Sequence, residues 1–154
     1  MLSVINLLRR IRSSRLGRRE IPAATAWQVI GWWEARRIPF NLIVGMAGLA
    51  SGVAILCIAV AGEIFFDVPF GMPDPPILAV AAIIVYALGA NVCFAGGWIA
   101  ELTVRRAWPD ESDRFGTLSF TLGLVFAVVV TLLPPILLGA SVALYGLLWA
   151  VGAV

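Results

Sequence analysis

Four long apolar stretches, separated by short polar segments, are the feature that most constrains how this chain folds. They cover residues 38–62, 77–100, 115–133 and 136–154, and each is close to or above the length of about 20 residues that an α-helix needs to cross a bilayer. Backbone groups in lipid must be paired within their own segment, and the alternation typical of barrel strands is absent. We therefore predict an all-α integral membrane protein with four transmembrane helices in a small bundle.

The composition agrees with membrane insertion, and the charges orient the chain. Apolar residues make up 61% of the sequence and charged residues 13%, with a mean hydropathy of +0.98, which is atypical of soluble domains. The 11 basic residues are all arginines, and none lies in the 63–76 segment, whose charged residues are all acidic. Under the positive-inside rule, the N-terminus and the 101–114 loop are cytoplasmic and the 63–76 loop lies outside. Four crossings then place the C-terminus in the cytoplasm as well.

The use of arginine in place of every lysine, together with abundant alanine, is typical of a GC-rich bacterial genome. We therefore expect the protein in the bacterial cytoplasmic (inner) membrane.

Residues 1–37 are predicted to form a cytoplasmic, arginine-rich and tryptophan-rich interfacial segment in front of a transmembrane domain over 38–154. Apolar residues at i, i+3, i+4 and i+7 from Val4 share one face of a helix, and arginines surround that face. Such an amphipathic helix lies on a membrane surface, where its six arginines favour anionic lipids of the inner leaflet.

The sequence GWWEARRIPFN, at 31–41, joins tryptophans and charges to the start of the first apolar stretch. We expect a short helix from Thr25 to Arg37 and a new helix from about Pro39, because tryptophan and arginine favour the headgroup layer and proline is tolerated at a helix start. A similar cluster ends the second stretch. The predicted membrane-interface residues are Arg9, Arg10, Arg12, Arg15, Arg18, Arg19, Trp27, Trp32, Trp33, Arg36, Arg37, Trp98, Arg105 and Arg106.

Antiparallel packing of the first two transmembrane helices would bring these two clusters to the same depth. We hypothesise that Glu34 and Glu101 each meet arginines of the other helix. A local pair between Glu34 and Arg37, three residues apart, is the alternative for Glu34.

Pro134 and Pro135 separate the third and fourth apolar stretches. A continuous helix over both would measure about 60 Å, twice the hydrocarbon thickness, so a turn is expected at the prolines. The last segment, 136–154, then either recrosses the membrane or lies on its outer surface, and we favour the recrossing because it has no polar face.

Polar and small residues inside the stretches are predicted to mediate helix packing. Asn91 lies about 21 Å from Arg105 by helix rise, near the bilayer centre, where an amide needs a partner. An interhelical hydrogen bond is favoured over a substrate or proton path. Glycine and alanine allow close helix approach, either within this chain or to another chain. The predicted packing residues are Asn41, Gly45, Gly48, Gly52, Asn91, Gly139, Ala143, Gly146 and Ala150.

Candidate catalytic groups are scarce. The chain has no histidine and no lysine, and its two cysteines, Cys57 and Cys93, fall at different depths. We therefore expect neither enzymatic activity nor a metal site, and no cofactor, although bound lipid is compatible with such a surface.

Two classes of function remain. The first is a noncatalytic accessory or assembly subunit of a larger membrane complex, with membrane lipids and other transmembrane subunits as partners. The alternative is a small oligomeric membrane transporter or channel, a class that includes chains of this size. The arginines have no nucleic-acid-binding motif beside them, so a nucleic-acid partner is not expected.

Overall fold

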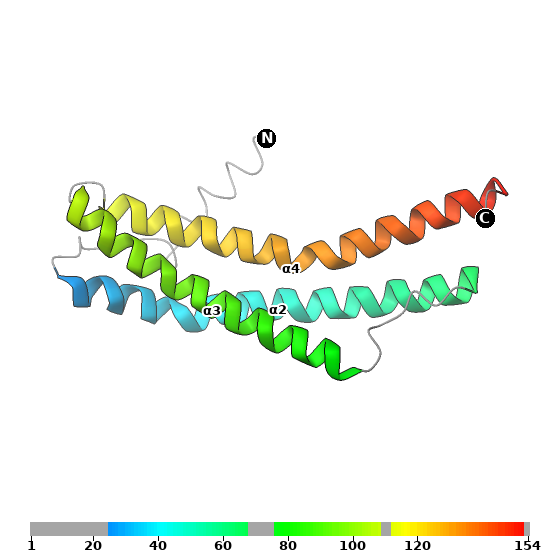
Figure 1. The fold of residues 1–154 in the computed structure, drawn as a ribbon, viewed down its shortest axis with the longest axis horizontal. Helices are drawn as coiled ribbons and strands as arrows, with labels where there is room; N and C mark the ends of the chain where they lie inside the picture. The colour runs from blue at the N-terminus through cyan, green and yellow to red at the C-terminus, as the bar shows by residue number, and fades with distance from the viewer. Residues whose placement is uncertain (1–24, 68–75, 109–111, 153–154) are drawn as a thin grey trace. The chain divides into compact units, whose positions relative to one another are not determined.

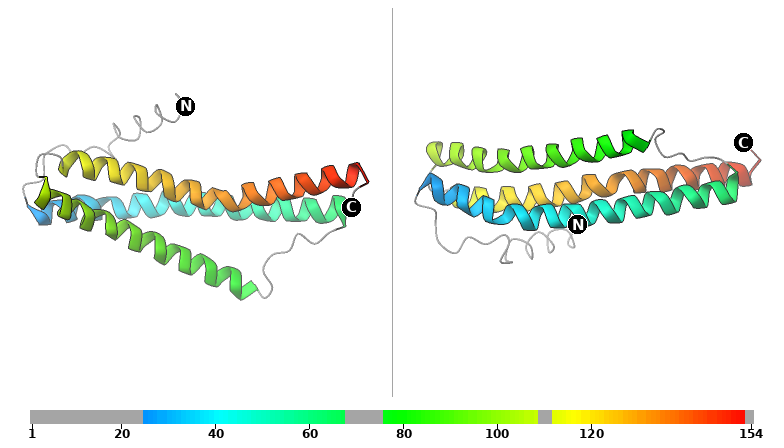
Figure 2. Two further views of the ribbon diagram at one scale, coloured as in Figure 1. Left: turned by 45° about the horizontal axis from the view of Figure 1, so that its top comes forward. Right: turned by 90° about the horizontal axis from the view of Figure 1, so that it is seen from below.

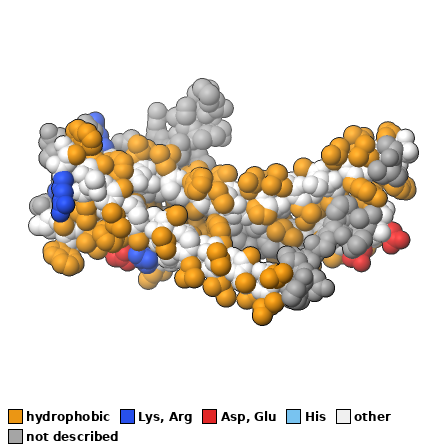
Figure 3. Space-filling view, viewed as in Figure 1, with side chains coloured by type: hydrophobic (Ala, Val, Ile, Leu, Met, Phe, Trp, Pro, Cys, Tyr) orange, Lys and Arg blue, Asp and Glu red, His pale blue; other side chains and the backbone are white. Residues whose placement is uncertain are grey.

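The computed structural model describes residues 25–67, 76–108 and 112–152. They form three helices: α2 over Ala26–Phe66, α3 over Pro76–Ala107 and α4 over Ser112–Ala150 (Figure 1). Each is long and apolar enough to cross a membrane, and hydrophobic side chains are spread along the face of the molecule seen in Figure 3. The chain is therefore all-helical and compatible with a multi-pass membrane protein, but the predicted fourth transmembrane helix is not confirmed.

α2 begins with a reciprocal cap and then continues through Pro39. The backbone N–H of Gln28 donates to Oγ1 of Thr25 at 3.3 Å, and the Thr25 N–H donates to Oε1 of Gln28 at 3.1 Å, which is the geometry of a capping box. The predicted boundary between two helices near Pro39 is wrong, because Pro39 lies inside one helix. A proline removes a single helical hydrogen bond, and α2 has buried aromatic residues both before and after it, Trp33 and Phe40.

Pro134 and Pro135 lie inside α4, so the predicted turn at these residues is wrong. The two prolines cost the helix two hydrogen bonds, because each lacks the N–H that would bond the carbonyl four residues earlier. A full turn in lipid would leave more backbone groups without partners, each at a cost of several kcal/mol. Continuing the helix is the less costly solution in a segment without charges.

The helices divide into two compact units, Met1–Ile43 with Leu88–Ala127, and Val44–Ala87 with Val128–Val154. In the first unit, α2 and α3 are antiparallel, because Trp33 lies against Gly97 and Asn41 against Asn91. Its core residues are Val29, Trp33, Phe40, Phe94, Phe120 and Leu124.

In the second unit, α2 and α4 run parallel and side by side (Figure 2). A Cβ built on Gly139 would lie 3.6 Å from Cδ1 of Ile58, and one built on Gly146 would lie 2.7 Å from Cζ of Phe66. Tyr86 of α3 and Thr131 of α4 share a hydrogen bond between their hydroxyl groups.

α4 is longer than one crossing of the hydrocarbon requires. Its 39 residues measure about 59 Å, more than hydrocarbon alone would cover. In the first unit, one face of the early part of α4 is buried, with Phe120 2% and Thr121 1% exposed, whereas Leu118 and Phe126 are 48% and 71% exposed. The start of α4 therefore combines a packed face with an exposed apolar face, which the sequence alone could not distinguish from a fully lipid-facing span.

Candidate functional site

The side chain of Glu101 on α3 lies at the centre of the first unit. It is 0% exposed, and its Oε2 accepts a hydrogen bond of 2.8 Å from Nε1 of Trp33 on α2. Gly116 of α4 completes the enclosure, because a Cβ at this position would overlap the Glu101 carboxylate. A carboxyl group is thus enclosed by residues of three helices, an arrangement that can fix these helices relative to one another within this unit.

Aromatic rings surround the Trp33 indole that donates to this carboxyl group. Trp33 packs edge-to-face against Trp32, Phe94 and Phe120, with ring centroids 5.6, 5.3 and 5.8 Å apart, and Phe40 packs on Phe94 at 4.9 Å. Such pairs are stabilising beyond the area they bury. The rings exclude water and leave the Trp33 indole little freedom to move.

A second polar group lies on the exposed side of α2 and α3. Nε and Nη2 of Arg37 each donate to the Glu34 carboxylate at 2.7 Å, and Nη1 donates to Oδ1 of Asn91 at 3.3 Å. The amides of Asn41 and Asn91 donate to each other at 3.2 Å in both directions. We call these four residues the polar ladder.

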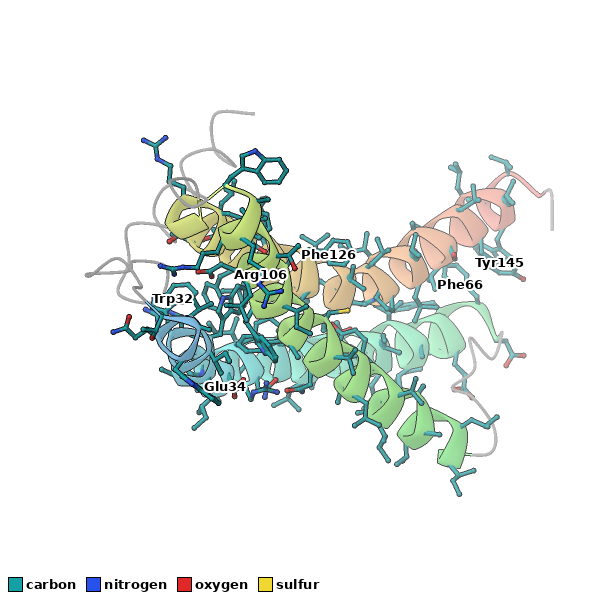
Figure 4. The ribbon with its side chains drawn as sticks, turned by 60° about the vertical axis from the view of Figure 1, so that its left-hand side comes forward. Trp32, Glu34, Phe66, Arg106, Phe126 and Tyr145 are labelled. Carbon is teal, nitrogen blue, oxygen red and sulfur yellow. The ribbon has the colours of Figure 1, made fainter. Side chains whose placement is uncertain are left out.

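The two glutamates thus have different surroundings. Glu34 pairs with Arg37 of its own helix, and it is Arg37 that reaches across to α3. Glu101 accepts a hydrogen bond from the Trp33 indole of α2, and the hypothesis that it also meets arginines of the other helix stays a prediction. Glu34 and Trp32 leave α2 in different directions (Figure 4). The Glu34 side chain is 43% exposed whereas Glu101 is fully buried, so the ladder and the buried carboxylate form separate sites.

The predicted interface residues occupy several environments. Trp27 is 81% exposed, Trp33 is in the core, and Arg36 covers the ring of Trp32 at 3.9 Å. Trp98 is half-buried and Arg106 is exposed, whereas Nη1 of Arg105 is buried with no hydrogen-bond partner among the described residues. The predicted arginines at 9, 10, 12, 15, 18 and 19 lie outside the described residues.

The predicted packing residues also divide. Asn41 and Asn91 are brought together by their hydrogen bond, which places Asn91 of α3 level with Asn41 of α2, four residues after Arg37. Gly48, Gly139 and Gly146 each face a side chain of the neighbouring helix.

The other small residues face outward. A Cβ at Gly45 or Gly52 would meet nothing within 4 Å, and Ala143 and Ala150 are exposed. These positions are open to lipid or to another chain.

Sequence reasoning missed the contact between Trp33 and Glu101. The two residues are 68 positions apart, and tryptophan beside arginines is read first as a headgroup anchor. The glycines at 97 and 116 were the available signal, since both allow close approach to large side chains.

Within the described part of the chain, histidine, cysteine and acidic side chains do not form a group of three that would hold a metal ion. Cys57 and Cys93 are free thiols. Comparisons of the chain with protein-family models, curated proteins and solved structures found no match.

Proposed function

We propose that this protein is a noncatalytic accessory or assembly subunit of a larger complex in a bacterial inner membrane. It docks through its helices and through the basic arm before α2. The observation that carries the proposal is the outward face of α2, where a Cβ built on Gly45 or Gly52 would meet nothing within 4 Å among the described residues. Small residues on a lipid-exposed helix allow a second helix to approach closely, and dispersion contacts then stabilise the pair.

The first test is co-purification. After gentle solubilisation, the chain is expected to migrate with unlike membrane subunits, and a Gly45→Leu/Gly52→Leu variant is expected to lose them while it still inserts and folds. Gly89→Leu is the matched control, because a side chain there also meets nothing within 4 Å but lies on α3. The proposal would be contradicted if both variants lost the co-purifying subunits equally, or if the chain migrated only with copies of itself.

A small oligomeric transporter or channel is the second candidate, and Glu101 favours it. A fully buried carboxyl group inside a membrane protein is often functional. A Glu101→Gln variant separates the two candidates, because glutamine keeps an oxygen to accept from Trp33. An accessory subunit should keep its partners and function in this variant, whereas a transporter that uses the carboxylate should lose flux and remain folded.

The orientation follows from the arginines and from three crossings. We propose that the arm before α2 and the loop between α3 and α4 are cytoplasmic. With a cytoplasmic N-terminus, three crossings place the C-terminus outside. This differs from the sequence-based expectation of a cytoplasmic C-terminus, which depended on a fourth helix.

A reporter fusion measures this orientation directly. An alkaline phosphatase domain after Val154 is expected to be active, and a green fluorescent domain there is expected to be dark, because each matures on one side only. The reverse pattern at the C-terminus would restore an even number of crossings. The same domains placed before Met1 provide the control and should report the cytoplasm.

A further inference from the structure

The polar ladder lies at the level where a bilayer would change from hydrocarbon to headgroups. On α2, the next charged residue after Arg37 is Glu63, about 39 Å further along the helix. This distance accommodates hydrocarbon of about 30 Å with part of the interfacial layers. The charges of α2 therefore bracket a single bilayer, with the ladder at one boundary.

A boundary at Trp27 is the competing placement, since this ring is 81% exposed. It would move Arg37 about 15 Å into the membrane, where each charged side chain costs about 2.5–3.5 kcal/mol. It would also push the apolar residues 54–62, which precede Glu63, out of the lipid. Exposing one tryptophan to water costs less, so the ladder marks the headgroup layer.

The surface around the ladder is apolar and exposed. Ile38 and Leu42 on α2 are 79% and 65% exposed, and Leu88 and Val92 on α3 are 63% and 71% exposed. The side chains of Arg37 and Glu34 remain 32% and 43% exposed. Polar atoms of the ladder therefore open onto a surface that lipid would cover.

The ladder offers donors beside an acceptor. Of the five N–H groups of an arginine, three are used in the described bonds of Arg37, which leaves two for a ligand. The Asn41 amide has one further N–H, because only one of its two donates to Asn91. The Glu34 carboxylate keeps lone pairs for a cationic donor, and the Arg37–Glu34 pair has no net charge.

We propose that the polar ladder binds the headgroup of an aminophospholipid. The phosphate accepts hydrogen bonds from Arg37 and Asn41, and the primary ammonium donates to Glu34. A choline headgroup lacks the N–H for the second contact, and a glycerol headgroup lacks the cation. The inference depends on membrane insertion alone and not on the partner complex.

Native mass spectrometry of the detergent-purified full chain tests this assignment. Phosphatidylethanolamine, phosphatidylcholine and phosphatidylglycerol of identical acyl chains are titrated in turn. The ethanolamine lipid is expected to bind about tenfold more tightly than the choline lipid, as expected for one charge-assisted hydrogen bond. Equal binding of all three lipids would overturn the proposal, as would displacement of bound lipid by inorganic phosphate.

Variants assign the contacts to residues. Glu34→Gln is expected to abolish the preference for ethanolamine over choline and to favour the anionic glycerol lipid. The ratio of the affinities for the ethanolamine and choline lipids does not depend on how much of the protein is folded. Arg37→Gln should weaken all three lipids, and Arg37→Lys should restore part of the binding.

Arg106→Gln is the matched control, because it removes the same charge from an exposed arginine in the last turn of α3. It is expected to leave the ethanolamine preference unchanged. An unchanged preference in Glu34→Gln, or equal effects of Arg37→Gln and Arg106→Gln, would show that the lipids bind elsewhere. Self-association that shields the ladder from every lipid would likewise overturn the assignment.

Discussion

Gly97→Ala is expected to lower the free energy of unfolding by about 2–3 kcal/mol, within the range for overpacking a well-filled core. The new methyl group would overlap Cη2 of Trp33 and lie 2.7 Å from its Cζ3. The ring cannot move aside easily, because it packs against Trp32, Phe94 and Phe120. Denaturant or thermal unfolding in lipid bicelles measures the change.

Gly96→Ala is the control for this substitution. Gly96 is the preceding residue on α3, and a Cβ there meets nothing within 4 Å. Alanine favours a helix interior over glycine by about 0.5–1 kcal/mol, so this variant should be neutral or slightly more stable. If the two alanine variants have the same free energy of unfolding, Trp33 does not occupy the position described.

The sequence predicted the helical class and the apolar segments well, because both follow from composition and segment length. It failed at Pro39 and at Pro134–Pro135, where proline was read as a helix boundary. Proline is a strong signal for a helix boundary in water, because the backbone N–H and C=O groups at a helix end can form hydrogen bonds with water. Where lipid or protein surrounds the helix, ending it exposes more polar groups than continuing it, and local sequence does not report which environment applies.

The candidate sites were less predictable, for a different reason. Asn41 and Asn91 stand out in sequence as polar residues within apolar stretches, so their contribution to helix contacts could be anticipated. The position of Glu101 could not, because its buried carboxylate contacts Trp33 of α2 and occupies the space left by Gly116 of α4, which are not its neighbours in sequence. The depth of Asn91 counted from Arg105 stays a prediction, because the contact with Asn41 fixes its level relative to α2 and not its depth in a membrane.

Trp33→Ala is expected to have the largest effect of any single substitution in the first unit. Removing a buried tryptophan side chain costs about 3–5 kcal/mol, and loss of the indole donor to the buried Glu101 adds about 1–3 kcal/mol. Trp27→Ala is the control, because its ring lies on the same helix but is 81% exposed; it should change stability by less than about 0.5 kcal/mol. Comparable losses in the two variants would contradict the burial of Trp33.

Combining substitutions at Trp33 and Gly97 tests the contact itself. Trp33→Phe removes the indole donor and the distal ring atoms that a methyl group at residue 97 would meet. Gly97→Ala should therefore be nearly neutral in the Trp33→Phe background, although it is strongly destabilising in the native chain. The resulting coupling, about 2 kcal/mol, lies within the range for residues in direct contact. Additive losses would mean that alanine at 97 acts through the backbone, and that the ring of Trp33 does not fill the space beside Gly97.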